Sequence, residues 1–302
     1  MAKALHVIVL GSAAGGGFPQ WNCRCPVCCL AWAGDPRVVP RTQSSLAVSA
    51  DGTSWVLLNA SPDLRQQILD TAALRPSTGA RHSPISAVVL TNGDVDHVAG
   101  LLTMREKQSF RLLCSAALHH MIDTDPIFAV LDPAAVTRQV LVSDTPVALA
   151  GLTVEAFAVP GKVPLFLERG EVEVGVMGEM TIGLDVSSGG RRLVYVPGCA
   201  AITDGLRKRL AGADVLMFDG TTFTDDEMVR LGLSPKTAAR MGHVAIDGAE
   251  GSLQGLADIA VGRRIYIHIN NTNPILVDGS PERQAVVRAG WEVAFDGMEI
   301  AV

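Results

Sequence analysis

A loop near the start of the chain concentrates cysteine. Cys23, Cys25 and Cys28 fall within six residues, and Cys29 directly follows the last of them. Three thiolates at this spacing can hold one tetrahedral Zn²⁺ through Zn–S bonds of about 2.3 Å, and the fourth ligand must then come from elsewhere in the fold. Buried free thiols or a redox pair are the alternatives, but a redox pair is typically one isolated Cys-x-x-Cys at a helix start. The spacing therefore predicts a structural zinc site.

A second group of polar residues follows an apolar run of strand length at 85–90. Asn92, Asp94, Asp96 and His97 lie within the six residues 92–97. A strand end of this kind projects carboxylate, amide and imidazole groups into one space, as a metal site requires. The alternative is a solvated loop in which Asp96 caps the following helix. The residues alone leave both interpretations open.

Two later strand ends and one glycine-flanked histidine add further candidates. Asp219 and His268 each end an apolar run of strand length, and His243 follows a glycine. Carboxylate and imidazole groups at such places can transfer protons. His268 can also ligate a metal if the fold brings it to Asp96 and His97. Each of these residues taken singly is more often an ordinary structural or loop residue.

The glycine-rich segment 11–17 follows a predicted strand, as a nucleotide-binding loop would. No helix follows it, however, and the Gly-Lys-Ser/Thr ending of a phosphate-binding loop is absent. We interpret the glycines as allowing the backbone to pass close to another element.

The elements that must position these residues indicate a sheet-rich fold. The runs 45–49 and 54–59 alternate in polarity around an Asp-Gly, which predicts a hairpin. Apolar periodicity predicts helices at 64–74, 98–107 and 253–261. Strands in antiparallel style come first and are then mixed with helices, which favours an α/β (α+β) fold with helices on the outer faces.

The composition excludes several classes of protein. With 302 residues, 48% hydrophobic and 19% charged, the chain is not disordered. A net charge of −6 argues against a nucleic-acid partner. Apolar runs fall short of the roughly 18 residues of a membrane span, so no membrane insertion is expected. The short run at 7–10 predicts a strand rather than a signal peptide, and hence a cytoplasmic protein. We expect one domain over 1–302, in two sheet–helix halves of about 1–150 and 151–302.

In this order, the segments resemble the metallo-β-lactamase superfamily. Its signature is His-x-His-x-Asp-His at a strand end, and the segment 92–97 stands in that frame. The resemblance is strongest to the phosphodiesterase and tRNA-processing branch, through Tyr-Val-Pro-Gly-Cys at 195–199, Phe-Asp-Gly-Thr-Thr-Phe at 218–223, Gly-His at 242–243, and His268. It implies a four-layer αββα sandwich with the metal site at one edge of the two sheets.

The chain resembles still more closely a family of pyrroloquinoline quinone (PQQ) biosynthesis proteins, over nearly all of its length. The segments 10–23, 41–45 and 268–274 carry this resemblance. It implies biosynthesis of the redox cofactor PQQ from a small-molecule precursor, a cross-linked Glu–Tyr. Other proteins of the pathway are the expected partners.

Departures from the superfamily signature change the implied chemistry. One metal position has lost most of its ligands, because Asn92 and Asp94 replace its two histidines. Gly161 and Gly198 stand near the places of its later histidine and of the bridging aspartate. Nothing would then hold the second ion of a two-metal hydrolase.

The other metal position keeps Asp96, His97 and His268, and Asp94 could add a fourth ligand or orient a ligand's ring. Two imidazoles and one carboxylate with open positions suit non-haem Fe(II) and O₂ activation. The resemblance therefore implies an iron-dependent oxidoreductase, a hydroxylase of the tyrosine-derived ring of the precursor.

The remaining assignments also follow from the resemblance. Asp219 and His243 are expected to hydrogen-bond substrate or move protons. Asn271 stands where a related phosphodiesterase completes its cysteine loop with a histidine, so it is the predicted fourth zinc ligand. Two alternatives stay open: a non-catalytic carrier that transports PQQ or its precursor toward the periplasm, and, ranked last, a zinc hydrolase.

Overall fold

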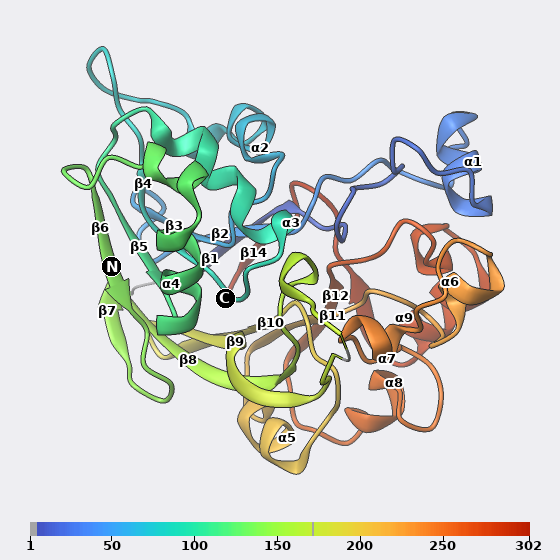
Figure 1. Ribbon diagram of the computed structural model, residues 1–302. Coiled ribbons are helices and arrows are strands. Elements are labelled where there is room, and N and C mark those ends of the chain that lie inside the picture. The colour runs from blue at the N-terminus through green and yellow to red at the C-terminus, as the bar shows by residue number, and fades with distance from the viewer. Residues whose placement is uncertain (1–4, 171) are drawn as a thin grey trace.

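The computed structural model describes residues 5–170 and 172–302, and in these residues two seven-stranded sheets pack face to face (Figure 1). The first sheet has the order β14 (Glu299–Ala301), β1 (His6–Gly11), β2 (Ser45–Ser49), β3 (Trp55–Leu58), β4 (Ile85–Val89), β5 (Phe110–Cys114) and β6 (Val136–Val140). The second has the order β13 (Trp291–Val293), β12 (Arg263–Ile267), β11 (Val215–Asp219), β10 (Arg191–Val196), β9 (Val176–Ser188), β8 (Leu152–Gly161) and β7 (Val147–Leu149). The last strand of the chain therefore completes the sheet that the first strand begins.

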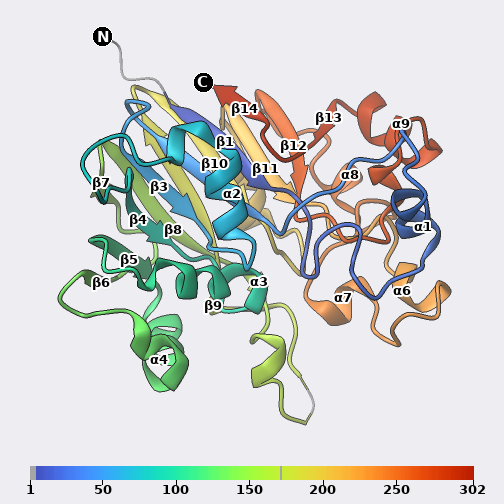
Figure 2. The same ribbon diagram turned by 90° about the horizontal axis from the view of Figure 1, so that it is seen from above.

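Helices cover the outer face of each sheet (Figures 1 and 2). The first sheet carries α2 (Leu64–Asp70), α3 (Val95–Val98) and α4 (Ala116–Thr124) with the 3₁₀ turns Ala72–Leu74, Ala99–Arg105 and Pro126–Val130. The second carries α5 (Asp204–Leu210), α8 (Ser252–Gly255) and α9 (Pro281–Arg288). The remaining elements are α1 (Pro26–Trp32), α6 (Glu227–Arg230), α7 (Ala238–Met241) and the 3₁₀ turns Leu165–Leu167 and Pro274–Leu276. Within the described ranges, every helix is too short to cross a membrane.

Apolar side chains fill the three spaces between the four layers. The inner faces of the sheets meet through buried residues such as Val48 and Leu184. Leu64 packs on the outer face of the first sheet, and Leu206 on that of the second. Burial of apolar surface of this kind is the main favourable term in folding. The layers confirm the predicted αββα sandwich.

The predicted hairpin is present between β2 and β3, which pair antiparallel. Asp51 Oδ1 accepts hydrogen bonds from the amides of Thr53 and Ser54, at 2.8 and 2.9 Å. Gly52 has a φ of +73°, a conformation that glycine adopts without strain. Both residues of the Asp-Gly pair therefore stabilise the turn, Asp51 through hydrogen bonds and Gly52 through its backbone conformation.

Two predicted helices are interrupted. The stretch 64–74 leaves the α-helix at Asp70 and continues as a 3₁₀ turn. The stretch 98–107 is mostly 3₁₀. The Gly100 amide there donates to the Ala60 carbonyl at 2.8 Å, and an added Cβ would lie 2.2 Å from the Ser61 carbonyl oxygen. Close packing on the neighbouring backbone replaces regular helical bonding.

The helix predicted over 253–261 is present only in its first residues. α8 ends at Gly255, and turns follow it. Leu256 and Ile259 are nevertheless buried, so these turns deliver the apolar residues to the core without a helix. Apolar spacing alone does not distinguish the two cases.

Candidate metal centres

The candidate residues meet at one edge of the sandwich, beyond the ends of parallel strands. Asp96 and His97 lie in α3, which follows β4, whereas Asp219 ends β11 and His268 follows β12. Since β11 and β12 are parallel, with Asp219 opposite Ile267, the residues at their ends emerge on the same side. The fold thereby brings His268 to Asp96, 172 residues away in sequence.

Asp96, His97 and His268 offer ligand atoms that all lie within 4.8 Å of one another. Asp96 Oδ2 is 3.0 Å from His268 Nε2 and 3.6 Å from His97 Nε2. Both ring nitrogens of His97 are buried and have no hydrogen-bond partner among the described residues. An unsatisfied buried polar group costs about 1–3 kcal/mol, and a metal ion bound to one nitrogen would remove that cost. The donor set therefore fits a divalent metal.

Charge in this group is organised around the Asp96 carboxylate. Burial disfavours its ionisation, but His97 and a hydrogen bond with His268 outweigh burial and hold the pKa of Asp96 below its usual range. Burial lowers the pKa of His97 to about 4, although Asp96 opposes the shift. Burial also disfavours protonated His268, yet the hydrogen bond with Asp96 raises its pKa. His97 is therefore neutral near pH 7, the form that ligates a metal.

Asp94 is not among the residues whose donor atoms meet. Its Oδ1 accepts a hydrogen bond from the Leu165 amide at 3.0 Å, and its own amide donates to Asn92 Oδ1 at 2.9 Å. Leu165 belongs to the connection between β8 and β9. Asp94 thus ties this connection to the start of α3, and its role as a metal ligand stays a prediction.

Asp219 and His243 lie beside His268, and the two imidazole rings stack with centroids 5.2 Å apart. His243 Nδ1 is 2.7 Å from Asp219 Oδ2. The hydroxyl of Thr221 donates to Asp219 Oδ1 at 2.7 Å and lies 2.9 Å from His268 Nδ1 and 3.1 Å from His243 Nδ1. By accepting from His268 Nδ1, Thr221 leaves Nε2 free to face Asp96 and a metal. Sequence reasoning missed Thr221, although a hydroxyl two residues after a strand-end carboxylate was the available signal.

Replacing Thr221 with valine is expected to weaken metal binding by the Asp96, His97 and His268 group about 10- to 100-fold, the usual cost of losing a partner that orients a ligating histidine. Valine keeps the shape of the side chain but removes the acceptor for His268 Nδ1. Anaerobic Fe(II) titration measures the effect, and Thr221→Ser should restore binding because it keeps the hydroxyl. Unchanged iron affinity in the valine variant would show that Thr221 does not position His268.

Of the two glycines that stand where the resemblance implies lost metal ligands, only Gly161 has a steric explanation. A Cβ added to Gly161 would lie 2.3 Å from Thr181 Oγ1, so a histidine cannot fit while Thr181 keeps its place. A Cβ on Gly198 would lie 3.6 Å from His243 Cε1, which is ordinary contact. Asn92 Oδ1 accepts from the Asp94 amide. Sterics therefore exclude a histidine at position 161 and leave room for a side chain at position 198.

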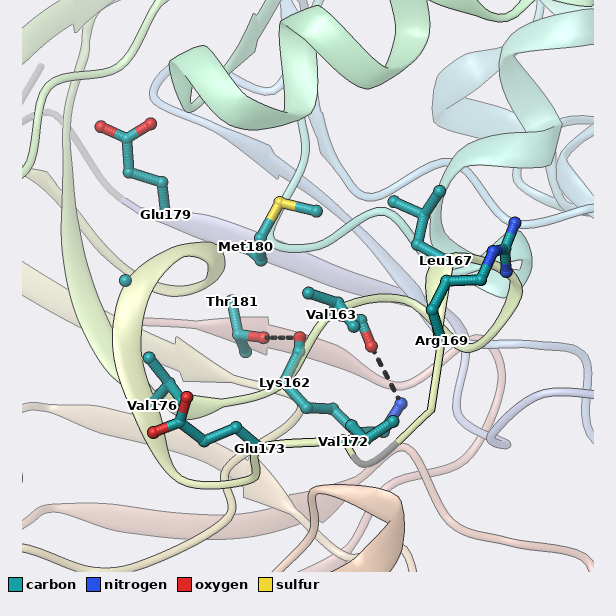
Figure 3. Close-up of a pocket in the computed structure, with 11 residues that line it drawn as sticks. Lys162, Val163, Leu167, Arg169, Val172, Glu173, Val176, Glu179, Met180 and Thr181 are labelled. Carbon is teal, nitrogen blue, oxygen red and sulfur yellow. Dashed lines mark hydrogen bonds between the residues drawn. The ribbon is translucent and has the colours of Figure 1, made fainter.

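A pocket of about 350 Å³ opens beside this edge (Figure 3). Val163, Leu167 and Met180 give it an apolar wall, and charged residues of both signs also line it: Lys162, Arg169, Glu173 and Glu179. Thr181, which also lines it, pairs with Asn92 in the segment that leads to the metal ligands. The apolar wall can receive the apolar body of an organic molecule, and the described residues that line the pocket include none of the candidate metal ligands.

The second candidate centre is the cysteine loop. The sulfurs of Cys23, Cys25 and Cys28 lie within 4.8 Å of one another, and all three residues are buried. Burial raises the pKa of Cys25 to about 12 and also raises that of Cys28, so zinc would have to displace their protons. Cys29 points away, with Sγ 3.3 Å from the Arg24 carbonyl oxygen. The loop thus presents three thiols to one point.

Asn271 lies opposite these thiols. Its Nδ2 is 3.1 Å from Cys23 Sγ and 3.2 Å from Cys28 Sγ. The two ends of a side-chain amide have nearly the same shape, so a half-turn would present Oδ1 in place of Nδ2. The structure therefore brings together all four residues that the sequence predicts for zinc.

Removing the Asn271 amide is expected to weaken zinc retention. Asn271→Ala leaves three thiolates and should lose most of its zinc on dialysis against a mild chelator, whereas Asn271→Asp keeps an oxygen ligand and should retain it. Asn270→Ala is the matched control, because that amide bonds Thr272 Oγ1 instead. Metal analysis reads the result, and full zinc retention in Asn271→Ala would rule out this ligand.

The glycine-rich segment lies close to the neighbouring backbone and to the Asp96 carboxylate. A Cβ on Gly11 would lie 2.1 Å from the Gln43 carbonyl oxygen, and one on Gly15 would lie 3.5 Å from Asp96 Cγ. The Ala14 amide donates to the Ile269 carbonyl at 2.9 Å. The close backbone approach that the sequence predicts is confirmed.

Comparison with known proteins defines the class of this fold and site. Residues 54–269 match the model of the beta-lactamase superfamily domain. A structure titled as a new diphosphatase from the PhnP family shares the fold, with a TM-score of 0.71 at 21% identity over 100% of this chain and 98% of that one. The protein is a member of the beta-lactamase superfamily.

Closer relatives narrow the assignment. The chain is 57% identical over 299 residues to coenzyme PQQ synthesis protein B of Methylobacterium sp. strain 4-46. The alignment covers 99% of this chain and 100% of the relative. A crystal structure of Zn²⁺-bound PqqB from Methylobacterium extorquens has a TM-score of 0.97 at 54% identity, over 98% of this chain and 100% of that one. The chain belongs to the coenzyme PQQ synthesis protein B family.

Proposed function

We propose that this protein acts in PQQ biosynthesis as an Fe(II)- and O₂-dependent hydroxylase of the tyrosine-derived ring of a cross-linked Glu–Tyr precursor. Relatives at 54–57% identity bear the name of PQQ synthesis. The observation that carries the hydroxylase is the donor set of Asp96, His97 and His268. Two imidazoles and one carboxylate with open positions are typical of non-haem iron sites.

Fe(II), when bound, supplies the activation of O₂, and the chain supplies ligands, orientation and proton transfer. Thr221 orients His268, as described above. His243 bonds Asp219 through Nδ1, which leaves Nε2 to accept a proton from the phenol of the substrate. The His243 side chain is 18% exposed, so a ligand can reach it. Hydroxylation places one oxygen atom of O₂ on the ring and releases the other as water, and it consumes two electrons from an external two-electron reductant and two protons.

The zinc site has a structural role in this proposal. Cys23, Cys25 and Cys28 belong to the N-terminal loop, whereas Asn271 lies three residues after His268. Zinc between them would brace the strand end that carries an iron ligand. Thiolate ligands persist in a reducing compartment, which is consistent with our assignment to the cytoplasm. Other proteins of the PQQ pathway would deliver the precursor or remove the product.

A second candidate function is a carrier that escorts PQQ or its precursor toward the periplasm. The absence of ligands at Gly161 and Gly198 favours it, because a fold that has lost a metal can retain a binding role.

Substrate-dependent O₂ consumption separates the two functions. The protein is loaded anaerobically with Fe(II), mixed with precursor and reductant, and exposed to O₂, while mass spectrometry follows the substrate. A hydroxylase consumes O₂ and adds 16 Da per oxygen inserted, an increment set by the atomic mass of oxygen. Binding of the precursor without O₂ uptake or mass change would establish the carrier. Lactam or phosphodiester turnover would instead establish a hydrolase.

A further inference from the structure

The segment 162–170, in the connection between β8 and β9, contacts the segments that carry Asp96 and His243 of the candidate reaction site. Figure 2 shows this connection projecting from the sheet edge below α3. Its Leu165 amide bonds Asp94 on one side. On the other side Lys162 packs on Gly242, where an added Cβ would lie 3.1 Å from Lys162 Cγ. Gly242 directly precedes the candidate acid–base histidine, so the segment borders the site on two sides.

One carboxylate in this segment, that of Glu168, forms ion pairs with three cationic side chains. Glu168 lies 3.1 Å from Lys162 Nζ, 3.2 Å from Lys236 Nζ and 3.1 Å from Arg240 Nη2. Arg240 belongs to α7, three residues before His243. Three cations around one carboxylate leave a surplus of two positive charges. The chain as a whole carries −6, so the cluster opposes the sign of the whole molecule.

The cations have more donors than Glu168 can use. A carboxylate accepts about four hydrogen bonds, whereas a guanidinium carries five N–H donors and each ammonium three. Glu168 and Lys162 are nearly covered, with side chains 11% and 10% exposed. Lys236 and Arg240 remain 31% and 36% exposed. Lys236 and Arg240 are therefore the two cations of the cluster whose side chains a ligand can reach most readily.

We propose that Lys236 and Arg240, held in place by Glu168, bind a carboxylate of the substrate and orient it toward the metal group. This inference rests on the proposed function for the identity of the ligand. A Glu–Tyr conjugate freed from a peptide carries two carboxylates from glutamate and one from tyrosine, and PQQ has three. Paired cations bind carboxylates through charge-assisted hydrogen bonds. On an acidic protein, a local positive cluster also steers such an anion toward its site.

The cluster keeps its charge near neutral pH. Hydrogen bonds from Arg240, together with those from Lys162 and Lys236, outweigh desolvation and lower the pKa of Glu168 to about 2. The carboxylate therefore stays ionised under assay conditions and continues to hold the three cations together.

The competing explanation is that the ion pairs only fasten the segment 162–170 to α7. Ligand charge distinguishes the two. Loss of ion pairs that only hold the segment in place would weaken binding of a charged ligand and of its uncharged ester alike. Loss of a direct contact with the ligand's carboxylate would weaken binding of the charged ligand alone. PQQ and its trimethyl ester are a matched pair for this comparison.

The test measures dissociation constants of PQQ and PQQ trimethyl ester for the full-length, iron-free protein by calorimetry at low salt. Lys236→Gln and Arg240→Gln are each expected to weaken PQQ about tenfold, the value of one hydrogen bond to a charged group. Both should leave the ester unchanged. Arg240→Lys should recover part of the PQQ affinity. Arg230→Gln changes the net charge equally, but Arg230 is paired with Asp226 outside the cluster, so it should bind PQQ as the parent does.

Two results would overturn the inference, and they are distinguishable. Parental PQQ affinity in Lys236→Gln and Arg240→Gln, or equal weakening of PQQ and its ester, would remove the carboxylate role and leave the proposed function standing. If the parent protein binds neither PQQ nor the Glu–Tyr precursor, the proposed function is wrong, and this inference with it.

Discussion

His97→Ala is expected to abolish the proposed ring hydroxylation and the retention of Fe(II) by the candidate site, while zinc stays bound. His97 is buried, its pKa is lowered to about 4, and both its ring nitrogens lack partners among the described residues. Alanine removes the donor atom itself, so the loss should exceed the roughly 10- to 100-fold cost of losing a supporting hydrogen bond. His268→Ala should behave in the same way. Turnover of the precursor and iron content per chain measure both effects.

His119 provides the matched control for these variants. It is also a buried histidine, but it lies in α4, and its Nε2 is 2.9 Å from the Gln139 carbonyl oxygen. His119→Ala should therefore lower stability without lowering iron content or the hydroxylation rate of the folded protein. Full hydroxylation by both His97→Ala and His268→Ala would eliminate the iron hydroxylase.

Part of each predicted metal centre depended on local signals that survive in a single sequence. Cys23, Cys25 and Cys28 lie within one loop, and Asp96 and His97 are adjacent, whereas His268 and Asn271 were assigned through the resemblance to known families. The hairpin at Asp51-Gly52 is local in the same sense.

Contacts between distant segments could not be predicted in this way. Asp94 accepts a hydrogen bond from the Leu165 amide, 71 residues later, and Glu168 accepts one from Arg240, 72 residues later. Neither pairing leaves a periodicity or a spacing in the sequence. Thr221 is similar, because its role depends on His268, which β12 brings alongside. The predicted helix over 253–261 ends early, at Gly255, for a related reason: burial of Leu256 and Ile259 does not require a helix.

The two candidate centres share one structural element but no ligand, so single substitutions can separate them. The chain after β12 carries His268 and, three residues on, Asn271. The Ile269 amide between them donates to the Ser12 carbonyl at 2.9 Å, which ties the same segment to the glycine-rich loop that leads to the cysteines. Zinc would therefore link the start of the chain to the floor of the iron site without sharing a ligand with it.

Cys25→Ser is accordingly expected to lose zinc and to keep the ability to bind iron. Binding of a ligand at a few hundred times its Kd stabilises the folded state by about 3–4 kcal/mol, so zinc loss should lower the Tm by roughly 5–10 °C. Cys29→Ser, whose sulfur points away from the other thiols, should keep its zinc. Cys114→Ser replaces an equally buried thiol outside the cluster and shows how much of the Tm change comes from burying serine.

Metal content of Cys25→Ser and His97→Ala, each after anaerobic Fe(II) loading, then decides between the functions. Zinc lost only from the first and iron lost only from the second would establish two separate sites, because each variant removes a donor from one group and leaves the other intact. Retention of iron together with precursor-dependent O₂ uptake in Cys25→Ser would further show that zinc has no part in the chemistry. If the parent protein retains zinc alone, even with precursor present, the donor set of Asp96, His97 and His268 does not serve iron, and the carrier is the better description.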